Sequence, residues 1–167
     1  MIFLTVGTQF PFDRLVQAVD KAVDHRLLDE KVFGQVGDQG YQPRNFECVG
    51  FLHKQVFDER LRSASSIISH AGIGIITSAL EYNKPLLVMP RLRRYGEVVH
   101  DHQVALARKF ELLGHILVAH EAEEIPAKIE QLKTFTPCKR SPQPQQVIEQ
   151  IAQFLNGLSN EESQELT

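Results

Sequence analysis

The sequence predicts an α/β domain built on a doubly wound, mostly parallel sheet of six strands. Two observations support this fold class. First, short apolar runs alternate with segments of helical periodicity, an alternation typical of parallel sheets covered by helices on both faces. Second, the 167 residues include 43% hydrophobic and 23% charged residues, which is the size and composition of one globular domain with a full core.

Six apolar segments are predicted to form the strands. They cover residues 2–6, 31–36, 46–49, 65–68, 86–89 and 116–118. The common doubly wound order for six strands is 3-2-1-4-5-6, which makes the first and fourth strands neighbours. The loops that follow these two strands, at Gly7 and at Gly72, are therefore expected to meet at the carboxyl edge of the sheet, where such folds bind ligands.

Helical segments lie between the strands. The first carries an apolar stripe made of Leu15, Val16, Val19, Ala22 and Val23. Further helices are expected over 56–61, 75–80, 100–113 and 124–132. Residues 1–133 thus form the predicted domain. Residues 134–157 are predicted to be a proline-rich linker with an amphipathic helix that begins at Val147. Residues 158–167 form an acidic tail that is expected to be disordered.

Composition excludes several classes of protein. A net charge of −3 does not favour nucleic-acid binding. Cys48 and Cys138 are too few and too far apart for a disulfide framework or a zinc site, so a reducing, cytoplasmic setting is expected. The first apolar run is too short for a signal peptide, and no run reaches the roughly 20 residues of a membrane span. Any membrane association is expected to be peripheral, through a partner.

The most informative motif is Ser69-His70-Ala71-Gly72-Ile73-Gly74, between a predicted strand and a predicted helix. Glycines at such a turn let the backbone approach a ligand, and free N–H groups at a helix start favour a phosphate. A tight turn without a ligand remains the alternative. NAD is disfavoured because neither loop has the G-x-G-x-x-G pattern. P-loop NTPase chemistry is excluded because the G-x-x-x-x-G-K-[ST] pattern is absent. Arg91 and Arg93 leave NADP open.

A second dense segment, 90–103, follows the fifth strand and opens onto the same edge. Arg93, Arg94 and Glu97 are expected to be solvated, as charged loop residues usually are. Asp101 and Gln103 are candidates for binding sugar hydroxyls, because they offer a short carboxylate and an amide. No metal site is expected, since His100 and His102 have no third ligand nearby.

Together these motifs resemble the Rossmann-like, donor-binding half of inverting GT-B glycosyltransferases, specifically the C-terminal domain of glycosyltransferase family 28. The matching residues are Thr5-Val6-Gly7-Thr8, Ser69-His70-Ala71-Gly72, Lys84-Pro85-Leu86 and Asp101-His102-Gln103. The resemblance extends to small catalytic subunits of split UDP-sugar transferases that act in dolichol-linked oligosaccharide and bacterial capsular or exopolysaccharide synthesis. Pro90-Arg91-Leu92 and Tyr95-Gly96-Glu97 point to the bacterial branch.

The resemblance implies a UDP-sugar donor, no metal in the nucleotide site, and a lipid-linked acceptor presented by a membrane-anchored partner subunit. It assigns the diphosphate to Gly7, Thr8, His70, Gly72, Ile73, Gly74 and Ile75. It assigns the uracil to the backbone near Phe51 and Leu52, and the donor sugar to Asp101 and Gln103.

One position departs from the family pattern. The glutamate that often grips the ribose is replaced by Ser78, and Glu81 lies three residues on, on the same helix face. His70 is the candidate catalytic side chain, with a neutral structural histidine as its alternative. A non-catalytic module that binds a nucleotide-sugar and signals through a partner, and an NADP-dependent reductase, remain alternative functions.

Overall fold

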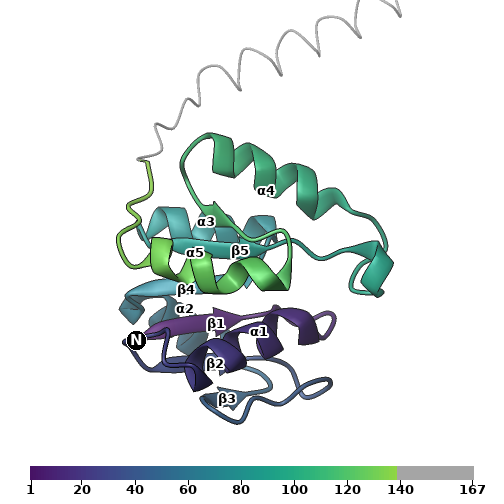
Figure 1. Ribbon diagram of the computed structural model, residues 1–167, viewed down its shortest axis with the longest axis vertical. Coiled ribbons are helices and arrows are strands. Elements are labelled where there is room, and N and C mark those ends of the chain that lie inside the picture. Colours follow the sequence, from purple (N-terminus) through teal and green to yellow (C-terminus); the bar gives the residue numbers. More distant parts are fainter. Residues whose placement is uncertain (139–167) are drawn as a thin grey trace, which may run out of the picture.

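The computed structural model describes residues 1–138 and contains one six-stranded sheet. Its strands are β1 (Ile2–Thr5), β2 (Val32–Gln35), β3 (Glu47–Val49), β4 (Ser66–His70), β5 (Leu86–Met89) and β6 (Leu117–Val118). The order is β3-β2-β1-β4-β5-β6 and every pairing is parallel (Figure 1). The predicted fold class and strand order are confirmed.

The register of β1 decides which polar groups meet at the carboxyl edge. Thr5, the last residue of β1, pairs with Gln35 on β2 and with Ser69 on β4. The loops after these three strands therefore begin side by side. The expected meeting of the Gly7 loop and the Gly72 loop follows from this pairing.

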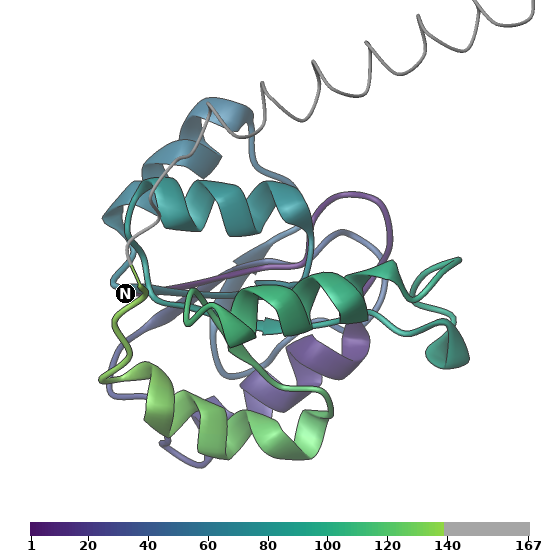
Figure 2. The same ribbon diagram turned by 90° about the horizontal axis from the view of Figure 1, so that it is seen from above.

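Helices cover both faces of the sheet. They are α1 (Asp13–Asp24), α2 (Lys54–Ser63), α3 (Ile73–Glu81), α4 (His102–Leu112) and α5 (Ile125–Leu132), with short 3-10 turns η1 (Arg93–Tyr95) and η2 (Ala122–Glu124). Figure 2 shows α2 and α3 on one side of the sheet, and α1 and α5 on the other.

Each face has its own apolar core. Leu15, Val16 and Val19 of α1 pack with Ile125 and Ile129 of α5 against one face. On the other face, the core joins α2, α3 and α4, and its members include Leu61, Ile76, Ala79 and Ala107. Strand residues alternate between these cores, as the period of two requires. Phe3 belongs to one core, whereas its neighbours Ile2 and Leu4 belong to the other.

The structure differs from the sequence expectations in two respects. The fourth strand runs on to His70, so this histidine ends a strand instead of lying in the loop. Glu97 was expected to be solvated but is buried, because it forms an ion pair with Arg14 of α1. The helix expected from Val147 and the acidic tail lie outside the described residues. Within 1–138, no helix is long and apolar enough to cross a membrane.

Candidate active site

A cavity of about 490 Å³ opens at the carboxyl edge of the sheet, between the loop after β1, the start of α3, and α2. Its wall includes five of the seven residues predicted to bind the diphosphate and both residues predicted to lie at the uracil: Gly7, Thr8, His70, Gly74 and Ile75, with Phe51 and Leu52. Thus the topology brings together residues from three separate stretches of sequence. Ser78 also lines this cavity.

The first turn of α3 faces the cavity with free backbone N–H groups. Gly72 is the N-cap residue, and no side chain caps the helix. The first helical bond runs from the Ile76 N–H to the Gly72 carbonyl, at 3.2 Å. The N–H groups of Ile73, Gly74 and Ile75 therefore have no partner within the helix. Because no acidic side chain lies in this turn, the positive end of the helix dipole is not neutralised there.

Glycine at position 74 keeps this turn open. A Cβ built on Gly74 would meet no atom within 4 Å, although the residue lines the cavity. Ile73, the first residue of the helix, is 54% exposed and is not part of the cavity wall. The arrangement is suited to an anionic group that approaches the backbone closely.

His70 lies between Gly7 and Gly72. A Cβ on either glycine would meet the imidazole ring, so both positions leave room for it. Ser69 Oγ donates to the Thr5 carbonyl at 2.6 Å and can therefore only accept from Nδ1 of His70, at 3.2 Å. This assigns the neutral tautomer with its proton on Nδ1 and a lone pair on Nε2. Burial, reinforced by the positive charge of Arg91, lowers the pKa of His70 to about 4.

Gln35 also lines the main cavity, although no motif in the sequence points to it. Its Oε1 accepts from the Thr5 hydroxyl at 2.6 Å, and its Nε2 donates to the carbonyls of Gly7 and Gly50, at 3.2 and 3.1 Å. A buried amide thus links the loops after β1 and β3. The sequence signal for this role is weak: a polar residue at the end of an apolar strand.

A second hollow of about 310 Å³ adjoins the first and shares Gly7, Thr8 and His70 with it. Its other walls include Arg91, His102 and Gln103. Gln103, predicted to contact a sugar, lines this hollow but is buried, and its Oε1 accepts from the Arg91 N–H at 3.1 Å.

Four other predicted residues line neither hollow: Gly72, Ile73, Asp101 and Glu81. Asp101 accepts from the Arg93 N–H at 2.7 Å and so fixes the loop after β5. Glu81 is exposed at the last residue of α3 and is absent from the cavity wall, whereas Ser78, one turn earlier, lines it. Sugar binding by Asp101 and Gln103, and ribose binding by Ser78 and Glu81, stay predictions.

The cavity also has two charged residues that sequence reasoning missed. Lys54 and Asp58 of α2 line it and form an i, i+4 ion pair at 2.6 Å. The Lys54 side chain is 87% exposed, so this pair contributes little to stability. Their signal in the sequence is weak, because such pairs are common on solvated helices.

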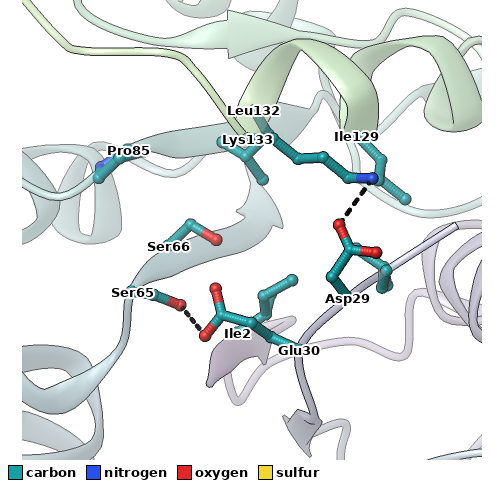
Figure 3. A pocket seen from close by; sticks show the side chains of 10 residues that line it. Ile2, Asp29, Glu30, Ser65, Ser66, Pro85, Ile129, Leu132 and Lys133 are labelled. Carbon is teal, nitrogen blue, oxygen red and sulfur yellow. Dashed lines mark hydrogen bonds and ion pairs between the residues drawn. The ribbon is translucent and has the colours of Figure 1, made fainter.

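A separate cavity of about 310 Å³ lies at the opposite, amino edge of the sheet (Figure 3). Ile2, Ile129 and Leu132 form part of its wall. Its charged groups are bound to neighbours, Glu30 to Ser65 and Lys133 to Asp29. None of the predicted site residues lines it, so it is not part of the candidate site.

The sequence matches the glycosyltransferase family 28 C-terminal domain over residues 1–157. The chain belongs to this family. As a family 28 domain, it has the Rossmann-like fold of GT-B glycosyltransferases, which the observed sheet order and its solved neighbours also show.

Curated relatives of this family 28 domain share one name. The UDP-N-acetylglucosamine transferase subunit ALG13 of Homo sapiens is 28% identical over 124 residues, 69% of this chain and 10% of that protein. The subunit of the same name from Eremothecium gossypii is 38% identical over 74 residues, 44% of this chain and 34% of that protein. The chain therefore spans a tenth to a third of the length of these relatives.

Solved structures give the same fold. An NMR solution structure of ALG13 aligns with a TM-score of 0.58 at 20% identity, over 86% of this chain and 91% of that one. Acinetobacter baumannii MurG aligns with a TM-score of 0.56 at 21% identity, over 79% of this chain and 40% of that one. At these identities the likeness is one of fold.

Proposed function

We propose that this chain is the donor-binding catalytic subunit of an inverting glycosyltransferase. It moves a hexose or an N-acetylhexosamine from a UDP-sugar to a lipid-linked acceptor in polysaccharide synthesis. The observation that carries this proposal is the uncapped first turn of α3, which faces the main cavity opposite Gly7 and Thr8. The printed names of the relatives, UDP-N-acetylglucosamine transferase subunits, support a UDP-sugar as the donor.

The donor is expected to lie across both hollows. Phe51, Leu52 and Phe57 offer the nucleoside an apolar wall in the main cavity. The diphosphate lies at His70, where the two hollows meet, and the sugar extends toward Gln103 in the second hollow. This orientation follows from the chemistry of the walls, because the main cavity places the exposed ring of Phe51 in the same wall as the start of α3.

The chemistry requires stabilisation of the UDP that departs. Negative charge grows on the diphosphate as the glycosidic bond breaks. The N–H groups of Ile73, Gly74 and Ile75 are already oriented, so they stabilise that charge without reorganisation, and one well-placed donor of this kind contributes about 3 kcal/mol. A bound cation is then not required. His70 lines both hollows and is the candidate catalytic side chain of this chain, although the lone pair on its Nε2 does not itself stabilise the negative charge.

A partner chain completes the enzyme in this proposal. The described residues form one doubly wound domain, whereas the GT-B site that they resemble lies between two. The relatives are named subunits. We therefore place the chain in the cytoplasm, held at the membrane by a membrane-anchored half-transferase that binds the lipid-linked acceptor and supplies the general base.

The test combines binding with transfer. Calorimetry of the full chain should detect UDP, and labelled sugar should reach a lipid acceptor only when the membrane-anchored partner is present. Absence of UDP binding by the folded protein would refute the assignment. Binding of UDP-sugar without transfer in the assembled complex would instead favour a non-catalytic, nucleotide-sugar-sensing module. Stabilisation by NADPH and not by UDP would favour a reductase.

A further inference from the structure

The side chain of Arg91 joins two loops at the carboxyl edge of the sheet. It follows β5 and is 4% exposed. Its Nη1 donates to the Pro11 carbonyl at 2.6 Å, and its Nη2 donates to the carbonyls of Val6 and Phe10, both at 2.7 Å. These three carbonyls lie on either side of residues 7–9. One guanidinium therefore holds both ends of the loop that carries Gly7 and Thr8.

Arg91 is itself held in place from several directions. Its guanidinium lies 4.6 Å from the centre of the Phe12 ring, and its N–H is bound by Gln103 of α4. The following loop is fixed by Glu97, which accepts two bonds of 3.0 Å from Arg14 of α1 and one of 2.9 Å from the Leu92 N–H. We call the set of bonds from Arg91 to the Val6, Phe10 and Pro11 carbonyls the Arg91 clasp. It is supported by two helices, α1 and α4, and is therefore held rigidly.

The charge of Arg91 is not neutralised by direct contact. Each hydrogen bond that its guanidinium makes ends on a backbone carbonyl. Glu97, the nearby carboxylate, is bound to Arg14, and among the described residues no carboxylate forms an ion pair with Arg91. Burial lowers the pKa of Arg91 to about 10, which leaves it protonated at neutral pH. A buried cation is costly unless hydrogen bonds or an opposite charge compensate it; here backbone carbonyls supply the hydrogen bonds, and the net charge stays available to an anion.

That cation lies next to the expected diphosphate. Arg91 lines the second hollow together with Gly7, Thr8 and His70. A lysine would keep the charge but not the whole set of bonds, since the planar guanidinium uses two nitrogens to reach four carbonyls, whereas an ammonium has one nitrogen on a flexible stem. Arg91 is therefore placed to position the loop after β1 and to supply positive charge near the diphosphate, and not to contact a reacting atom.

We propose that Arg91 is a positioning residue for the donor diphosphate. It clasps the loop after β1 so that the Gly7 and Thr8 backbone faces the first turn of α3, and it adds a fixed positive charge behind that loop. This inference rests on the proposed function for its ligand, but the clasp itself is a property of the chain that can be measured without one.

The test uses Arg91→Lys and Arg91→Ala, with Arg93→Ala as the matched control from an exposed position in the same loop. UDP affinity is measured by calorimetry and uridine affinity by NMR titration. Arg91→Ala should lose at least tenfold in UDP affinity and Arg91→Lys at least threefold, while uridine affinity changes less than twofold. Arg93→Ala should match the unchanged protein. Methylguanidinium should restore part of the UDP affinity of Arg91→Ala.

Three outcomes decide the matter. Equal losses for UDP and uridine would overturn the proposal, because a merely structural residue would affect both ligands. Unchanged UDP affinity in Arg91→Lys would also overturn it, and this variant carries the test if Arg91→Ala does not fold. If the unchanged protein binds neither ligand, the proposed function fails. In that case amide hydrogen exchange over residues 7–10 tests the clasp. We expect exchange at least tenfold faster in Arg91→Lys than in Arg93→Ala. Equal exchange rates in the two variants would overturn the clasp.

Discussion

The imidazole of His70 occupies the space that a side chain on Gly72 would fill. A Cβ built on Gly72 would stand far inside contact distance of His70 Nε2. The position of the ring therefore depends on glycine at position 72, which leaves room for it. Any substitution at Gly72 moves His70 as well. It follows that Gly72→Val cannot test the phosphate site alone.

Gly74→Ala is the cleaner probe of that site. The new methyl group meets no protein atom within 4 Å but enters the cavity. Alanine is also favoured over glycine inside a helix by about 0.5–1 kcal/mol. We expect an unchanged or slightly higher melting temperature and a loss of at least tenfold in UDP affinity by calorimetry. Gln17→Ala on the exposed side of α1 serves as control. Wild-type UDP affinity in Gly74→Ala would show that the ligand does not approach this turn.

Ser78 and Glu81 can be separated by two substitutions. Ser78 lines the cavity, whereas Glu81 does not. Ser78→Glu places a carboxylate where the family often has one for the ribose, and we expect UDP affinity to rise severalfold. Glu81→Ala should leave UDP affinity within twofold. Both are read by calorimetry. A loss of affinity in Glu81→Ala would mean that this side chain reaches the ribose when the ligand is bound.

Protein stability should depend on pH through His70. Its folded pKa of about 4 lies below the unfolded value of about 6.5, so the unfolded chain binds more protons between these values. The contribution of neutral His70 to the free energy of unfolding is complete above pH 6.5 and is lost as pH falls toward 4. The loss amounts to roughly 3 kcal/mol at most, because each pKa unit corresponds to about 1.4 kcal/mol.

Urea unfolding at pH 7 and pH 4.5 measures this effect. In His70→Asn, the part of the pH dependence that belongs to the imidazole should disappear. If the variant and the unchanged protein lose equal stability on acidification, His70 is not buried in its neutral form.

UDP binding should not require a divalent cation. In the described residues, no group of three His, Cys, Asp or Glu side chains is placed to hold a metal ion. Asp101 is bound to the Arg93 N–H, and the N–H groups of α3 are available to the phosphates. Affinity measured by calorimetry should be equal in EDTA and in Mg²⁺. Strict dependence on Mg²⁺ or Mn²⁺ would indicate that Asp38 or Asp101 organises the diphosphate through a cation.

The sequence alone determined the architecture. The apolar runs and the stripe from Leu15 to Ala22 are local signals, since the periods of strands and helices depend on residues that are close in the sequence. The position of Gly72 and Gly74 between a strand and a helix was likewise legible, because the turn needs those residue types whatever packs around it. The order of the sheet followed from how such strands connect.

Only the tertiary structure decided which side chains meet. Arg14 and Glu97 are 83 positions apart, and Gln35 bonds residues on two other strands or their loops. From the sequence, Arg91 left NADP binding open; in the structure its side chain is bound to the loop after β1. These partners are chosen by burial: a charged or amide group removed from water must find donors or acceptors wherever the fold places them. No local pattern of residues encodes that choice, because the partners come together only after the sheet and helices have packed.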